Sequence, residues 1–143
     1  MLHFQIDTQS GVPVYRQIVS QIKYYVASGA LKAGDLLPSI RELAQSLAVN
    51  PTTVVRAYSE LEQEKVLEMQ QGRGAFVADA ARRMTAGKRE QALRRLARQL
   101  AVEAVQLGAP GDLVAKLVQE ELEALQDASE SQLPARLSVV GKR

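Results

Sequence analysis

The chain has 143 residues, 46% of them hydrophobic, which suits one folded domain with a short appendage and excludes a wholly disordered chain. It contains no cysteine, so disulfides and thiolate metal sites are excluded. The sequence has neither an apolar run of about eighteen residues nor a basic start followed by a long apolar stretch. It therefore predicts no membrane span and no signal peptide, and it favours a cytoplasmic setting.

The net charge of +2 is unevenly distributed along the chain. Residues 1–80 contain seven Lys/Arg and eight Asp/Glu, residues 81–100 contain seven and one, and residues 101–143 contain four and seven. The central basic cluster consists of Arg82, Arg83, Lys88, Arg89, Arg94, Arg95 and Arg98. Such a run is more often a solvated helix face than a nucleic-acid contact. A role in contacting phosphates stays open for Arg82, Arg83 and Lys88.

Two helices are predicted in the first fifty residues. Residues 13–28 carry apolar side chains at every fourth position, which predicts a helix whose buried face is formed by Val14, Ile18, Ile22 and Val26. Gly29 is placed to end this helix, and Gly34–Asp35 predicts a turn. A second helix is expected to begin at Ser39, because Ser39 and Glu42 form a capping box. Its inward-facing residues are Ile40, Leu43, Ala44 and Leu47.

A third helix is predicted to begin after Asn50, a good helix cap, with Pro51 at its first position. At about 100° per residue, one side carries the apolar stripe of Val54, Ala57, Tyr58 and Leu61. The opposite side carries Thr52, Arg56, Ser59 and Gln63. None of these outward residues is acidic, whereas an ordinary solvated face would more often include Glu or Asp. This outward strip suits contact with base edges and phosphates.

A hairpin is predicted after the third helix. Two short β-type runs, Val66–Gln70 and Ala75–Ala78, flank a connection with two glycines, which allow the positive φ angles of a tight reversal. Helix, helix, short turn, helix and glycine-tipped hairpin is the order of a winged helix-turn-helix. Arg73, between the glycines, can extend into a minor groove or along a nucleic-acid backbone. Gln71 and Gly72 offer an amide side chain and an accessible backbone amide beside it.

Beyond residue 79 the apolar residues recur at spacings of three and four, which predicts two helices joined at Gly108–Gly111, with Asp112 capping the second. The short connection predicts an antiparallel hairpin. Its apolar surface exceeds what two helices can cover against each other, so a second copy of the chain is the simplest partner. The residues expected at this dimer interface are Leu93, Leu96, Leu100, Leu107, Leu117, Leu122 and Leu125.

The sequence thus predicts a mainly α-helical fold with a small β-hairpin. A winged helix-turn-helix domain at residues 1–79 precedes a two-helix antiparallel dimerisation hairpin at residues 80–128. Residues 129–143 lack a sustained periodicity and are expected to form a flexible tail.

Simpler interpretations of the candidate contacts remain open. In these interpretations Thr52 and Thr53 merely cap the start of the helix, Arg56 is an ordinary solvated residue, and the Gly-Arg-Gly tip is simply a turn. Their co-occurrence in the winged-helix order favours DNA binding, and a winged-helix module that binds another protein is the rival hypothesis. The sequence shows no constellation for catalysis or metal binding, predicts no cofactor, and identifies no small-molecule effector.

The stretch LPSIRELAQSLAVNPTTVVRAYSELEQEKVLEMQQGRGAFVA, at Leu37–Ala78, resembles the GntR family of bacterial transcription regulators. The preceding PVYRQIVSQIKYYVASGALKAGDLLPS is similar to the family's opening helix and turn. Asn-Pro-x-Thr-Val at Asn50–Val54, followed by Arg56-Ala57-Tyr58, looks like the YtrA subfamily, as does the short two-helix extension.

This resemblance implies a transcription regulator, by family default a repressor, that binds a two-fold-symmetric operator in double-stranded DNA as a homodimer. It places the DNA-contacting groups at Arg41, Asn50, Thr52, Thr53, Arg56, Gln71, Gly72 and Arg73. The helical wheel adds Ser59 to them. Pro51 and Val55 stand where many members of the family have arginines. Affinity is therefore expected to depend on Arg41, Arg56, Arg73 and the amides at the helix start.

Overall fold

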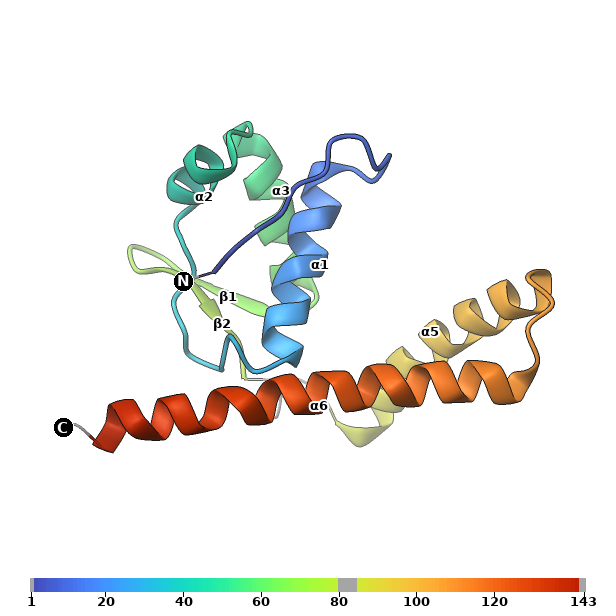
Figure 1. The fold of residues 1–143 in the computed structure, drawn as a ribbon. Coiled ribbons are helices and arrows are strands. Elements are labelled where there is room, and N and C mark those ends of the chain that lie inside the picture. Colours follow the sequence, from blue (N-terminus) through green and yellow to red (C-terminus); the bar gives the residue numbers. More distant parts are fainter. Residues whose placement is uncertain (1, 80–84, 142–143) are drawn as a thin grey trace. The chain divides into compact units, whose positions relative to one another are not determined.

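The computed structural model describes residues 2–79 and 85–141, and of residues 131–141 it describes only the backbone. The chain divides into two units, Met1–Arg83 and Met84–Arg143. The first unit contains α1 (Val14–Ala27), α2 (Ile40–Leu47), α3 (Pro51–Gln63), β1 (Leu67–Gln70) and β2 (Gly74–Val77) (Figure 1). This order confirms the predicted winged helix-turn-helix fold.

An aliphatic core holds the first unit together around α3, which packs against α1, α2 and β1. The predicted apolar stripe of α3 is confirmed, because Val54, Ala57 and Leu61 are fully buried and Tyr58 is 2% exposed. The other helices and the hairpin contribute Ile18, Ile22, Leu43, Leu67 and Val77 to the same cluster. Removing these side chains from water is the main force that keeps the elements together.

Local caps define where α2 and α3 begin, as predicted, but of the capping box only the bond to the Ser39 hydroxyl is found among the hydrogen bonds of residues 2–79. The Ser39 hydroxyl accepts a hydrogen bond from the Glu42 backbone N–H at 3.1 Å, and the Asn50 side-chain oxygen accepts one from the Thr52 N–H at 2.9 Å. Between them, Ala48 ends α2 in the left-handed conformation at φ 55°. The connection between the helices is therefore very short, which restricts the orientation of α3 against α2.

Tyr58 links α3 to Pro38, which lies two residues before α2. Its hydroxyl donates a hydrogen bond to the Pro38 carbonyl at 2.7 Å. Burial raises the pKa of the Tyr58 hydroxyl, and the nearby Glu42 carboxylate raises it further, so the group stays a neutral donor. Because Pro38 lies directly before the Ser39 cap, this bond helps to position the first turn of α2 relative to α3.

The wing contains more pairing than the sequence predicts. β1 and β2 form an antiparallel pair in which Leu67 faces Val77 and Gln70 faces Gly74. Residues 34–37, of which Gly34–Asp35 were predicted as a turn, also bond to β2: the Leu37 N–H donates to the Ala75 carbonyl and the Val77 N–H donates to the Asp35 carbonyl, both at 2.9 Å. The segment before α2 thus lies along β2 and supports the hairpin.

Residues 2–12 lie along α1, where Leu2, Phe4 and Ile6 pack against the core. Two glutamine side chains of α1 hold this segment. Gln21 accepts from the Gln5 N–H at 2.9 Å and donates to the Gln5 carbonyl at 2.6 Å. Gln17 makes the equivalent pair of bonds with the backbone of Asp7, each at 2.8 Å. Residues 2–12 are therefore packed and hydrogen-bonded onto α1, a contact that periodicity did not reveal.

The second unit contains α5 (Ala86–Gln106) and α6 (Gly111–Gly141), joined by a short turn after which the chain reverses direction (Figure 1). Thr85 caps α5, because its hydroxyl accepts from the Lys88 N–H at 3.2 Å. Asp112 lies in the first turn of α6 and does not cap it, since the helix begins one residue earlier. None of the helices within the described residues is long and apolar enough to span a membrane.

The helix α6 extends further than the sequence predicts. The backbone is helical to Gly141, whereas the two-helix region was predicted to end at residue 128. Three serines, two valines, a proline and a glycine are among the thirteen residues 129–141, so neither periodicity nor composition predicts this part of the helix. Periodicity detects a buried face, so it misses a helix that continues without one.

Candidate nucleic-acid interface

The strip on α3 opposite the core is exposed, as predicted. Thr52, Arg56, Ser59 and Gln63 are all exposed, while the stripe that faces the core is buried. The exposed strip combines small hydroxyls, an amide and a guanidinium, and it carries no carboxylate. Such groups donate hydrogen bonds to phosphate oxygens and to base edges. We call these four residues the α3 strip.

The amino-terminal end of α3 differs from the expected phosphate site in one respect. The backbone N–H of Thr52 is bonded to the Asn50 side chain, and that of Thr53 donates to the Asn50 carbonyl at 2.9 Å. These two amides already have acceptors within the chain. A phosphate near this end would therefore meet the side chains of Asn50 and Thr52, which are exposed, before it meets these amides.

Asn50→Asp tests the charge requirement at this end while keeping the cap. A carboxylate oxygen can accept the Thr52 N–H bond as the amide oxygen does, so the unfolding free energy should change by less than about 0.5 kcal/mol. The added negative charge should weaken DNA binding by about tenfold, measured by fluorescence anisotropy at constant salt. Asn50→Ser, a neutral cap, is the matched control. Equal affinities of the two variants would contradict a phosphate near Asn50.

The tip of the wing presents Gln71, Gly72 and Arg73, all exposed. Gly72 adopts φ +77°, and the Arg73 N–H donates to the Gln70 carbonyl at 2.9 Å to close the turn. The Arg73 guanidinium lies 5.5 Å from the centre of the Phe76 ring, within the range of a cation–π contact. The turn therefore carries an exposed cation that lies beside β2.

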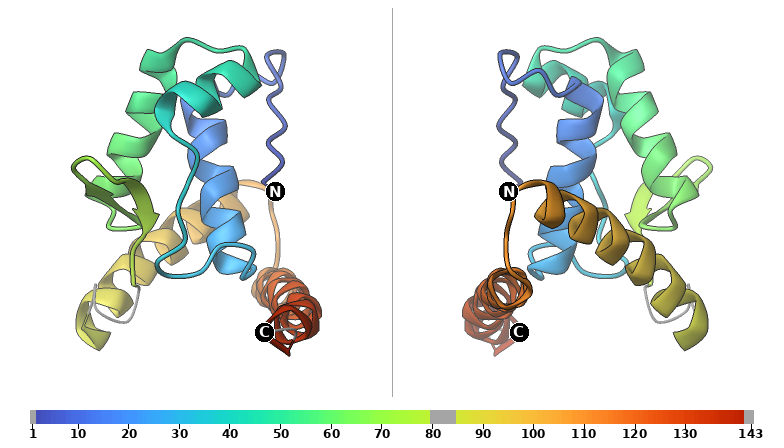
Figure 2. Two further views of the ribbon diagram at one scale, coloured as in Figure 1. Left: turned by 90° about the vertical axis from the view of Figure 1, so that its left-hand side faces the viewer. Right: turned by 90° about the vertical axis from the view of Figure 1, so that its right-hand side faces the viewer.

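The exposed candidates come from three elements of the first unit. Arg41 is exposed in the first turn of α2. In the left view of Figure 2, α3 and the hairpin tip lie along one edge of this unit, with α1 on the inner side of α3. The arrangement gives a helix and a loop with cations on neighbouring elements, which is the geometry needed to contact a groove and the adjacent backbone.

Tyr15 on α1 is a site residue that the sequence did not indicate. The Arg56 guanidinium carbon lies 3.9 Å from the centre of the Tyr15 ring. Arg56 remains exposed, so the contact does not remove it from solvent. The apolar periodicity of α1 places Tyr15 beside its buried face, but no local signal pairs it with a residue on α3.

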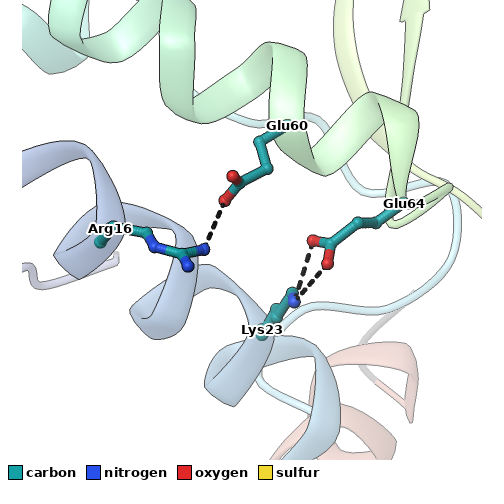
Figure 3. Close-up of polar contacts among 4 residues, drawn as sticks. All are labelled: Arg16, Lys23, Glu60 and Glu64. Carbon is teal, nitrogen blue, oxygen red and sulfur yellow. Dashed lines mark hydrogen bonds and ion pairs between the residues drawn. The ribbon is translucent and has the colours of Figure 1, made fainter. Parts of the chain in front are cut away.

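Two ion pairs connect α1 to the flank of α3 (Figure 3). Arg16 Nη1 lies 3.3 Å from Glu60 Oε2, and Lys23 Nζ lies 2.9 Å from Glu64 Oε2. Exposed pairs of this kind contribute only about 0–1 kcal/mol each to stability. Each pair also places a cation next to a carboxylate that lies beside the α3 strip.

The second unit exposes many of its apolar side chains. Six of the seven predicted dimer residues are at least 43% exposed, namely Leu93, Leu96, Leu100, Leu107, Leu117 and Leu122. Leu125 is half-buried, and Ala104 is buried. Of the basic cluster, Lys88, Arg89, Arg94, Arg95 and Arg98 are exposed on α5, while Arg82 and Arg83 lie outside the described residues. Contiguous exposed apolar residues are typical of interaction surfaces.

Comparison with known proteins agrees with this geometry. The model of a family described as bacterial regulatory proteins, gntR family, matches residues 14–77. The chain is 39% identical over 100 residues to the HTH-type transcriptional repressor YtrA of Bacillus subtilis (strain 168), an alignment that covers 70% of this chain and 77% of YtrA.

Solved structures show the same fold. A protein from Listeria monocytogenes EGD-e, described as a transcriptional antiterminator, is 35% identical with a TM-score of 0.75. The superposition covers 90% of this chain and 93% of the Listeria chain. YtrA from Sulfolobus acidocaldarius, described as a GntR-family transcription factor, is 40% identical with a TM-score of 0.55, covering 68% and 97% respectively. By its winged-helix fold and its identity to YtrA over most of that protein's length, this chain belongs to the GntR family of bacterial transcription regulators.

Proposed function

We propose that the chain is a homodimeric repressor of transcription that binds a two-fold-symmetric DNA operator through the α3 strip and the wing tip. The observation that supports this most directly is the exposed, carboxylate-free strip of α3, opposite a fully buried stripe. Phosphate repels carboxylates and attracts guanidinium groups, so this strip suits a duplex groove. The repressor role follows the name of the Bacillus subtilis relative.

The homodimer is proposed from the second unit. Leucines along α5 and α6 leave apolar surface in contact with water, and a second copy of these helices would bury it. A dimer with two-fold symmetry presents two copies of α3 to DNA. Its operator should then consist of two inverted half-sites about one helical turn, or roughly 10 base pairs, apart.

Selection of bound sequences from a random DNA pool tests the function. We expect the selected sites to show inverted symmetry and a constant half-site spacing. Arg56→Ala and Thr52→Ala should each reduce the ratio of operator to random-sequence affinity by at least fivefold, since a lost contact costs about 1 kcal/mol or more. Far-UV circular dichroism should confirm that both variants stay folded.

Two outcomes would contradict the proposal. If the random pool yields no preferred sequence, the rival function as a protein-binding winged helix is favoured. If the variants keep the operator preference of the parent protein, α3 is not the element that recognises the operator sequence. Sedimentation tests the assembly separately: a monomer at micromolar concentration would contradict the homodimer, whereas Leu100→Glu together with Leu117→Glu should convert the dimer to monomer.

A further inference from the structure

We propose that Tyr15 and Arg16, adjacent on α1, are positioning residues that keep the Arg56 guanidinium exposed and available to donate hydrogen bonds to DNA. The inference rests on the proposed function of the α3 strip and assigns α1 a part in it. Tyr15 supplies a surface for the Arg56 guanidinium, and Arg16 occupies the carboxylate that Arg56 would otherwise bind.

The first part of the device is the stack of Arg56 on Tyr15. The guanidinium carbon is 3.9 Å from the ring centre, well inside the distance of about 6 Å within which a cation is attracted to a ring face. Tyr15 is half-buried and packs against the core, so its ring is held by its neighbours, whereas Arg56 is exposed. Stacking on the face of the guanidinium leaves its N–H groups, which lie at the edge, able to donate.

The second part concerns Glu60, which lies four residues after Arg56 on α3. Residues at this spacing are neighbours on a helix surface, so Glu60 could form an ion pair with Arg56. In the structure Glu60 pairs with Arg16 at 3.3 Å (Figure 3). Within residues 2–79, Arg56 contacts the Tyr15 ring and has no carboxylate partner.

The physical benefit is preorganisation of a flexible cation. A free arginine side chain loses rotamer freedom when it binds, and it must first break any ion pair that it makes. The stack restricts Arg56 before DNA arrives, and Arg16 removes the competing acceptor. Both effects should strengthen binding without adding a contact between α1 and DNA.

A double-mutant cycle tests the stack. Tyr15→Leu should weaken operator binding by about fivefold in the parent protein and by less than about twofold in the Arg56→Ala background. Tyr15→Phe keeps the aromatic face and should bind within about twofold of the parent. Equal losses in the two backgrounds, or equal losses for Tyr15→Leu and Tyr15→Phe, would overturn the positioning role.

A second pair of variants leaves the core unchanged and so remains informative if Tyr15→Leu unfolds. Arg16→Ala frees Glu60 to pair with Arg56 and should weaken operator binding about threefold. Adding Glu60→Gln should restore the affinity, because the amide has no charge. Failure of Glu60→Gln to restore binding would overturn this part of the inference.

The same measurements separate this inference from the proposed function. If Arg56→Ala weakens operator binding but Tyr15→Leu does so equally in both backgrounds, only the positioning role is wrong. If Arg56→Ala leaves operator binding unchanged, the α3 strip is not the reader, and the inference is overturned together with the proposed function.

Discussion

Ser59→Glu should weaken operator binding by about 100-fold, since like charges brought together at an interface cost several kcal/mol. Ser59 is exposed on α3, one turn from both Arg56 and Gln63, so a glutamate there would place a carboxylate in the middle of the α3 strip. The measurement is fluorescence anisotropy with selected operator DNA at constant salt, because affinities at different salt concentrations are not comparable.

Ala33→Glu is the matched control for this prediction. Ala33 is exposed in the turn between α1 and α2, so the added charge is the same, while the position is outside the α3 strip. We expect its operator affinity to stay within about threefold of the parent, the size of a long-range charge effect screened by salt. If the two glutamate variants lose affinity equally, net charge rather than the α3 strip determines binding, and the interface is elsewhere.

Leu61→Ala should reduce the unfolding free energy of the first unit by about 2–5 kcal/mol. Leu61 is fully buried where α3 meets the core, and its removal leaves both lost apolar contact and a cavity. This loss is a large fraction of the roughly 5–15 kcal/mol that stabilises a typical domain. Urea unfolding followed by far-UV circular dichroism measures it.

Leu36→Ala removes the same atoms at a position that is 60% exposed. It should change the unfolding free energy by less than about 0.5–1 kcal/mol, because little surface is returned to water. Similar losses for the two variants would contradict the placement of α3 at the centre of the core. The chain has two units, which can unfold separately, so the observed unfolding transition must be assigned to the first unit. Loss of operator binding during the same titration is a suitable second probe for this assignment.

Most of the first unit could be predicted from local patterns. The apolar stripe of α3, the caps at Ser39 and Asn50, and the glycine-tipped hairpin all depend on residues within a few positions of one another. A cap bond spans two or three residues, and a helical face repeats every three or four, so a short window of sequence contains the whole signal. The exposed positions of the α3 strip followed from the same periodicity.

Two of the errors had a local origin and one had a long-range origin. Asp112 was expected as a cap because its side chain is suitable, but Gly111 adopts the helical conformation first. The continuation of α6 through residues 129–141 was not predicted, because this stretch lacks an apolar stripe and contains Pro134, which disfavours a helix interior. The pairing of residues 34–37 with β2 was missed because it joins segments about forty residues apart, a separation that turn chemistry does not address.

By itself, the sequence determined the order of the elements, the buried side of α3 and the composition of the strip opposite it, because each of these is encoded over one or two helical turns. Only the tertiary structure decided that the Tyr15 ring lies under Arg56 and that Arg16 forms an ion pair with Glu60, 44 residues away in the chain. Such pairs depend on how α1 packs against α3, and that packing results from the burial of the entire core.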